Sequence, residues 1–154
     1  MAPNCMRKRS ASTLLVLNPD GHLLLFRFAH TDGPLAGKTH WATPGGGLES
    51  NETFVQAAVR ELREETGIAV GMVGAAVACR EFVLTLADGE QVLADERFFV
   101  VHTVNHSISG AHWTESERKV MTEHRWWTAS ELQLTNEVVW PRNLHEMLRA
   151  AGLW

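Results

Sequence analysis

The stretch GGLESNETFVQAAVRELREETGI, residues 46–68, carries the clearest structural signal in the chain. Thr53 and Gln56 have the spacing of a capping box, in which each side chain bonds the backbone N–H of the other residue. Gly67 suits the left-handed conformation just past a helix end. Residues 54–66 contain neither Pro nor Gly. The stretch therefore predicts a helix with a defined start and a defined end.

The expected helix has two distinct faces when it is read at about 100° per residue. An apolar stripe is expected to face the core and comprises Val55, Ala58, Val59, Leu62 and Thr66. A second stripe comprises Ala57, Glu61, Glu64 and Glu65. Clustered carboxylates provide the oxygen ligands that a hard cation such as Mg²⁺ prefers. On the helix alone, an acidic and solvated face is the more common explanation, because such runs of glutamate are frequent on protein surfaces.

The residues before the helix favour a metal site. The segment WATPGGGL, residues 41–48, predicts a short strand that runs into a Gly-rich loop and leads to the helix N-terminus. Helix N-termini attract phosphate groups, and a carbonyl in such a loop can add a metal ligand. Strand, loop and acidic helix together predict a metal-assisted phosphate site.

Residues 46–68 resemble the Nudix box, G-x5-E-x7-R-E-U-x-E-E-x-G-U with U aliphatic, at every fixed position. The matching residues are Gly46, Glu52, Arg60, Glu61, Leu62, Glu64, Glu65, Gly67 and Ile68. This resemblance implies an α/β fold, a Nudix-type α/β/α sandwich with a mixed β-sheet. It also implies hydrolysis of the pyrophosphate bond of a nucleoside diphosphate linked to another moiety, with Mg²⁺ or Mn²⁺ as cofactor.

The resemblance also assigns roles within the box. The implied metal ligands are Glu61, Glu64, Glu65 and the backbone carbonyl of Gly45 or Gly46, and both glycines are expected to approach the substrate closely. The implied role of Arg60 is to orient a glutamate through a charge-assisted hydrogen bond. Glu52 is expected in a supporting or secondary metal role. A simple favourable charge before the helix is an equal alternative for Glu52.

A general base in this family often comes from a carboxylate outside the box, in a loop after the long strands. The candidates here are Glu115, Glu117 and Glu123, of which we select Glu117. Glu96 competes, because an inward-pointing glutamate on a neighbouring strand could join the carboxylate cluster. A box glutamate such as Glu64 is the alternative base if no loop carboxylate reaches the site.

The chain has six tryptophans and no tyrosine. Trp113 and Trp140 lie in or near expected loops and are candidates to stack on a base or sugar. Trp41, Trp126 and Trp127 lie in expected strands and are more readily explained as core residues.

The remaining pattern predicts a single Nudix domain over residues 10–154, preceded by a disordered arm at residues 1–9. The expected strands are residues 11–17, 22–28, 40–43, 72–86, 93–104 and 125–128. Helical segments are expected at 129–132 and 141–151, and residues 105–120 are expected to cover the site as a loop. Asn18 to Gly21 predicts a hairpin turn.

Net charge, cysteine content and the length of apolar runs limit the kinds of binding partner and the cellular compartment that we expect. A formal net charge of −4 argues against binding to long nucleic acids. Two cysteines form no disulfide framework, and the apolar run Leu14 to Leu17 is too short for a signal peptide or membrane span. We therefore expect a cytoplasmic protein, and the resemblance implies a nucleotide-type small-molecule substrate. The resemblance also allows a homodimer, although no sequence feature indicates one.

The sequence leaves the substrate and two alternative functions open. Family members that act on ADP-ribose resemble one another in a proline downstream of the box, and those that act on diadenosine polyphosphates in a tyrosine. Val83 to Leu86 fills that region here and contains neither. Substrates of the nucleoside triphosphate or nucleotide sugar type therefore remain. A noncatalytic nucleotide-sensing Nudix domain that regulates a partner is the main alternative, although such a sensor has no need of the intact glutamates. An isomerase of isoprenoid diphosphates would require Cys79 as its catalytic thiol.

Overall fold

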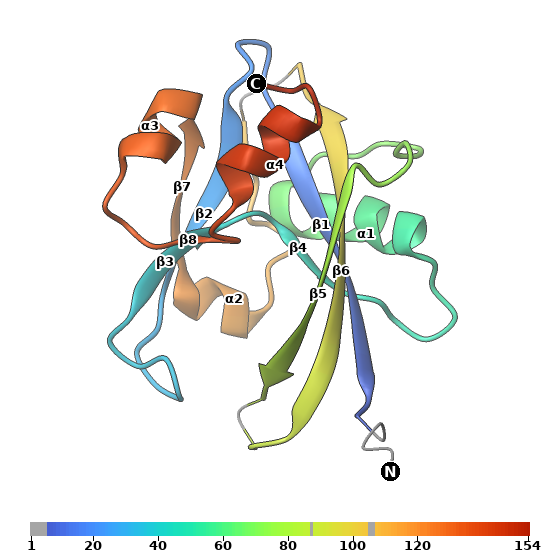
Figure 1. Ribbon diagram of the computed structural model, residues 1–154, viewed down its shortest axis with the longest axis vertical. Helices are drawn as coiled ribbons and strands as arrows, with labels where there is room; N and C mark the ends of the chain where they lie inside the picture. Colours follow the sequence, from blue (N-terminus) through green and yellow to red (C-terminus); the bar gives the residue numbers. More distant parts are fainter. Residues whose placement is uncertain (1–5, 87, 105–106) are drawn as a thin grey trace.

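The computed structural model describes residues 6–86, 88–104 and 107–154, and these residues form one mixed β-sheet between helices (Figure 1). The strands are β1 (Lys8–Leu17), β2 (Leu23–Ala29), β3 (Thr39–Ala42), β4 (Gly45–Gly47), β5 (Ala78–Thr85), β6 (Gln91–His102), β7 (Met121–Trp127) and β8 (Val139–Trp140). The sheet order is β5-β6-β1-β2-β3-β8, with β4 paired to β1 and β7 paired to β2. The helices are α1 (Phe54–Thr66), α2 (Glu115–Val120), α3 (Ala129–Leu134) and α4 (Leu144–Ala150).

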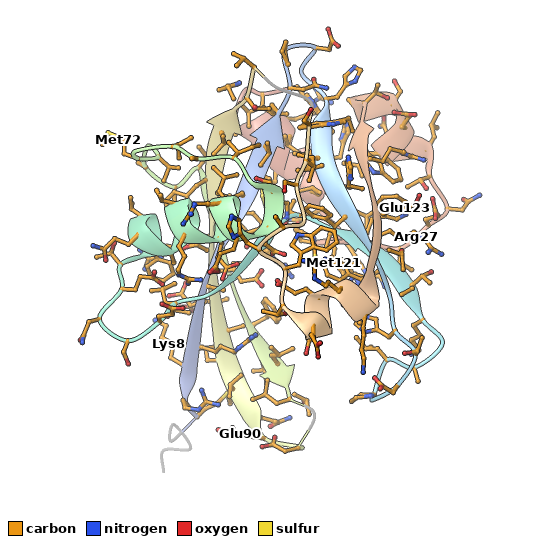
Figure 2. All side chains as sticks on the ribbon, turned by 180° about the vertical axis from the view of Figure 1, so that it is seen from behind. Lys8, Arg27, Met72, Glu90, Met121 and Glu123 are labelled. Carbon is orange, nitrogen blue, oxygen red and sulfur yellow. The ribbon has the colours of Figure 1, made fainter. Side chains whose placement is uncertain are left out.

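Strand β1 is the centre of the sheet and is buried on both faces. Leu14 and Val16 point into the core beneath α1, whereas Leu15 and Leu17 point into the core beneath α4. This alternation is the period-two pattern of a strand covered on both sides. The opposite views in Figures 1 and 2 place α1 and α4 on opposite faces of the sheet. The expected α/β/α sandwich with a mixed sheet is confirmed.

One edge of β1 pairs with two different strands, β2 and β4. The strand pairs in parallel with β6 along its whole length, from Lys8 opposite Leu93 to Leu17 opposite His102. On its other edge it pairs with β2 near Leu17 and with β4 at residues 11–13. The Gly-rich segment is therefore held in the sheet directly below α1.

Helix α1 begins and ends as expected. Thr53 and Gln56 form the capping box, and Gly67 adopts the left-handed conformation with φ 80°. The hydroxyl of Ser12 on β1 donates to the Phe54 carbonyl at 2.6 Å, which fixes the first turn against the sheet. The helix is rotated further than the apolar stripe predicted, so Glu65 is buried and Val55 is exposed. Strand β4 lies against the carboxylate side of the helix, next to Glu61 and Glu65.

Several expected boundaries are wrong. Gly45–Gly47 is the strand β4 and not a loop, because its backbone pairs with β1. The strand expected at residues 72–86 begins only at Ala78, and the preceding segment places Val73 in the core beneath α1. The loop expected at residues 105–120 contains α2, and its first two residues, 105 and 106, lie outside the described part of the chain.

The N-terminal boundary also differs from the expectation. Strand β1 begins at Lys8, inside the arm expected at residues 1–9, while residues 1–5 lie outside the described part. Trp41 and Trp127 are buried in the core, as expected, and Trp126 packs at its margin. Among the described residues, no helix is both long and apolar enough to cross a membrane.

Candidate functional site

Arg60 holds the carboxylates of α1 in place. Its Nε and Nη2 donate to the two oxygens of Glu52, each at 2.8 Å, and Nη2 also donates to the Gly47 carbonyl at 2.9 Å. Its Nη1 donates to Glu61 and Glu64, both at 2.9 Å. The hydrogen bonds to Glu52 make the largest contribution to the raised pKa of Arg60, and Glu61 and Glu64 add to it. The hydrogen bonds from Arg60 in turn lower the pKa of Glu52. Arg60 therefore orients two box glutamates, and Glu52 fixes Arg60.

Glu65 is the most deeply buried carboxylate of the box, with 3% of the residue exposed. It accepts a hydrogen bond from the Gly45 N–H at 3.0 Å. Burial is the main cause that raises its pKa to about 8; the neighbouring carboxylates of Glu117 and Glu61 contribute to this rise, and the Gly45 hydrogen bond opposes it. A buried carboxylate in this environment needs either a proton or a cation.

Glu61 lies against the backbone of β4. A side chain at Gly46 would overlap the Glu61 carboxylate, whose Cδ would lie 2.7 Å from the added Cβ. Burial raises the pKa of Glu61, and Glu64 and Glu117 add to this rise while Arg60 opposes it. The absence of a side chain at Gly46 thus lets the strand pass directly beside the carboxylate.

Two contacts tie the segment before α2 to the C-terminal end of α1. The Ser109 N–H donates to the Thr66 carbonyl at 2.9 Å, and the Trp113 indole N–H donates to the Glu65 carbonyl at 2.8 Å. The Trp113 ring also packs edge-on against Phe26, with the centroids 5.8 Å apart. In this structure Trp113 anchors the segment beside the site, and its expected contact with a substrate stays a prediction.

Helix α2 delivers Glu117 to the carboxylate cluster. Thr114 caps the helix, and Glu117 returns the bond by accepting the Thr114 N–H at 2.9 Å. From this position the Glu117 carboxylate acts on the pKa of both Glu61 and Glu65. The structure therefore brings the selected base candidate together with the box glutamates.

The other base candidates lie elsewhere. Glu123 on β7 pairs with Arg27 on β2 at 3.8 Å, and Figure 2 shows this pair on the side of the molecule away from α1. Glu96 accepts from Arg80 at 3.2 Å and faces a cleft on β5 and β6. Glu115 is exposed at the first position of α2.

A cleft of about 660 Å³ opens beside β5 and β6. Its lining residues come from β5, β6 and the segment at β8 and are Arg80, Phe82, Leu84, Glu96, Trp140, Arg142 and Asn143. A smaller hollow of about 280 Å³ shares Arg80, Glu96 and Trp140 with it and continues along Gly45–Gly47. The cleft thus leads from Trp140, a residue expected to contact substrate, to the strand beside the carboxylates.

Sequence reasoning missed most of this cleft. The alternation of β5 offered a signal, because Arg80, Phe82 and Leu84 share one face of that strand. Arg142 and Asn143 follow β8, a strand of two residues that the sequence pattern did not predict.

The donor set fits a divalent cation in its chemistry. Within the part of the chain that the structure describes, no three metal-ligating side chains stand together as a ready-made ligand set. Glu61 and Glu64 instead bind Arg60, and Glu65 binds Gly45. Burial, followed by the neighbouring carboxylates, nevertheless raises the pKa values of Glu61 and Glu65, and a bound cation would offset both effects.

The buried Glu65 predicts a pH-dependent stability in metal-free buffer. Its pKa rises from 4.5 to about 8 on folding, so the folded state binds the additional proton between these values. Stability should therefore fall as the pH rises through this window, by on the order of a few kcal/mol. Urea unfolding at pH 5 and pH 8 with EDTA measures this change. Glu65→Gln should show a clearly shallower slope and Glu123→Gln an unaltered one; equal slopes for all three proteins would contradict the assignment.

The sequence and the fold both match known proteins. Residues 6–148 match the family model described as NUDIX domain. The chain is 39% identical over 70 residues to an RNA pyrophosphohydrolase of Halorhodospira halophila and 40% identical over 63 residues to the phosphatase NudJ of Escherichia coli. These matches cover 46% and 41% of this chain but only 35% and 38% of the relatives, so the chain spans little more than a third of their length.

Solved structures with the same fold cover nearly the whole chain. The MutT protein of Methanosarcina mazei aligns with a TM-score of 0.70 and 21% identity, over 96% of this chain and 95% of that one. The ORF135 protein of E. coli aligns with a TM-score of 0.66 and 25% identity, over 95% and 94%. The NUDIX domain of Shewanella oneidensis NrtR, solved in complex with ADP ribose, aligns with a TM-score of 0.61 and 15% identity, over 95% and 88%.

Proposed function

Because the chain belongs to the NUDIX domain family, we propose that it is a Mg²⁺- or Mn²⁺-dependent hydrolase that cleaves the pyrophosphate bond of a nucleoside diphosphate linked to another moiety. The observation that carries this proposal is the cluster of the buried Glu65 with the partly buried Glu61 and Glu117 beside β4. Carboxylates whose pKa values are raised by burial and by like charges are typical of functional sites.

Glu61, Glu64 and Glu65 would hold the cation, together with a carbonyl of β4. When bound, the cation neutralises the diphosphate and polarises its phosphorus for attack by water. Arg60 keeps Glu61 and Glu64 oriented toward each other before the cation binds, because one guanidinium nitrogen bonds both carboxylates. Glu52 acts on the site indirectly, through its two bonds to Arg60.

Glu117 is the proposed general base. One of its oxygens accepts the Thr114 N–H, and this bond fixes the side chain at the start of α2. Its carboxylate lies beside Glu61 and Glu65, where water that attacks the diphosphate would reside. Glu117 would take the proton of that water as the new P–O bond forms and the bond to the leaving phosphate breaks.

The cleft is the proposed site for the organic part of the substrate. Phe82, Leu84 and Trp140 offer apolar and aromatic surface, while Arg142 and Asn143 offer hydrogen-bond donors. This combination suits a nucleobase, which has a flat apolar face and a polar edge. The cleft is compatible with both substrate types that the sequence leaves open, the nucleoside triphosphate and the nucleotide sugar.

The alternatives receive less support from the geometry. A noncatalytic nucleotide sensor would use the cleft but has no need of Glu117 beside the box glutamates. An isomerase with Cys79 as its thiol would require that residue at the cleft, yet Cys79 is exposed on the opposite face of β5 from Phe82. A cytoplasmic location and a homodimer stay predictions.

A nucleotide panel tests the proposal. It should contain nucleoside triphosphates, nucleotide sugars, ADP-ribose and dinucleoside polyphosphates, each incubated with Mg²⁺ and with EDTA. We expect release of phosphate, pyrophosphate or a nucleoside monophosphate from at least one class, only with the metal. Tight binding of a nucleotide without turnover of any compound would favour the sensor instead.

A further inference from the structure

Trp140 forms a wall of the cleft, and its ring is supported from behind. One face of the indole stacks on His40, with the ring centroids 4.0 Å apart and the planes inclined by 28°. The residue remains 38% exposed, and it lines both the larger cleft and the hollow beside β4. The exposed part of the indole is available for contacts in the cleft.

His40 is itself fixed by rings on the neighbouring strand. It stacks on Phe28 at 5.1 Å with an interplanar angle of 9° and on His30 at 5.4 Å with an angle of 14°. The pairing of β2 with β3 places Phe28 directly opposite His40. Only 8% of His40 is exposed. Burial and the neighbouring His30 lower the pKa of His40 to about 4, so its ring is neutral at neutral pH.

The backbone brings these rings together from distant parts of the sequence. Strand β8 pairs in parallel with β3, with Ala42 opposite Trp140, so His40 lies two residues before the partner of Trp140. The Trp41 N–H donates to the Val138 carbonyl at 2.8 Å and fixes this register. The support of Trp140 therefore belongs to the sheet, whereas Trp140 itself lies on a strand of only two residues.

We propose that His40 is a positioning residue that holds the Trp140 ring ready to stack on the planar group of the substrate. This inference rests on the proposed function, because it assumes a substrate with a nucleobase in the cleft. A side chain that is ordered before binding loses less conformational freedom when the ligand arrives, so support of this kind tightens binding. His40 itself does not touch the substrate.

The inference predicts a selective change in affinity. His40→Ala should weaken binding of a nucleoside triphosphate about threefold to tenfold. Binding of inorganic tripolyphosphate, which lacks a planar group, should not change. His40→Phe should restore nucleotide binding, because it provides another neutral flat ring. His102→Ala, a histidine variant at the exposed end of β6, is the matched control and should bind both compounds like the wild type.

Titration calorimetry measures binding of both compounds to the full chain in the presence of Ca²⁺. The series also includes Trp140→Ala and the double variant His40→Ala/Trp140→Ala. The double variant should bind the nucleotide no more weakly than Trp140→Ala, since both changes remove one stacking surface. Equal weakening toward both compounds, or fully additive effects, would overturn the inference. Unchanged nucleotide binding by His40→Ala would overturn it as well. If the wild type binds neither compound, the proposed function fails first.

Discussion

Replacing Glu64 with Gln is expected to lower kcat by about three orders of magnitude, because one negative ligand of the cation is lost. The fold should be preserved. The Glu64 side chain is 41% exposed and pairs with Arg60 one turn away. Such pairs on a helix surface contribute only about 0.3–0.5 kcal/mol.

Steady-state hydrolysis of the best substrate with saturating Mg²⁺ measures this effect, and thermal unfolding monitors the fold. Glu123→Gln is the matched control, because Glu123 is an exposed glutamate whose partner is the distant Arg27. It should retain wild-type kcat. Near-wild-type turnover by Glu64→Gln would show that the site has been misassigned.

Replacing Glu117 with Gln should lower kcat by about 10²–10⁴-fold, the usual contribution of a positioned general base. Gln retains the carbonyl oxygen that accepts the Thr114 N–H, so the capping box and the start of α2 should survive. The substitution removes the ability to accept a proton, together with the negative charge that acts on Glu61 and Glu65. KM should change little, because Glu117 is not among the residues that line the cleft proposed to bind the nucleobase.

Glu131→Gln provides a closely matched control for Glu117→Gln. Glu131 occupies the same position of a capping box in α3, where it accepts the Thr128 N–H at 2.8 Å. Any loss that arises from capping alone should therefore appear in both variants. Equal kcat values for Glu117→Gln and Glu131→Gln would remove Glu117 as the base and return Glu64 as the next candidate.

The sequence predicts the parts of this protein that are encoded locally. Helix α1 has a capping box at Thr53 and a left-handed Gly67, and both signals lie within the helix or next to it. The carboxylate stripe follows from the helical period alone. Glu117 on α2 was selected through the resemblance to a family. The structure places its carboxylate near those of Glu61 and Glu65.

Features that depend on tertiary contacts were not accessible in the same way. A run of three glycines has no side chains that reveal a strand, and β4 exists because β1 offers it a free edge. The burial of Glu65 depends on β4, because the Gly45 N–H of that strand bonds the Glu65 carboxylate. The role of Trp113 as an anchor depends on a bond to Glu65, 48 residues away.

The cleft was even less predictable. It is bounded by β5, β6 and the segment after β8, which are separated by long stretches of the chain. The two residues of β8 are too few for a periodic pattern, and their position depends on pairing with β3. The stack of Trp140 on His40 could therefore be recognised only from the structure.

The central claim is that the carboxylates of α1 hold a divalent cation, and titration with Mn²⁺ followed by electron paramagnetic resonance tests it most directly. The wild type, Glu61→Gln, Glu64→Gln and Glu123→Gln should be compared with and without nucleotide. We expect saturable binding by the wild type and Glu123→Gln, and markedly weaker binding by the two box variants. Equal Mn²⁺ binding by all four proteins, or none by the wild type in the presence of nucleotide, would contradict the claim.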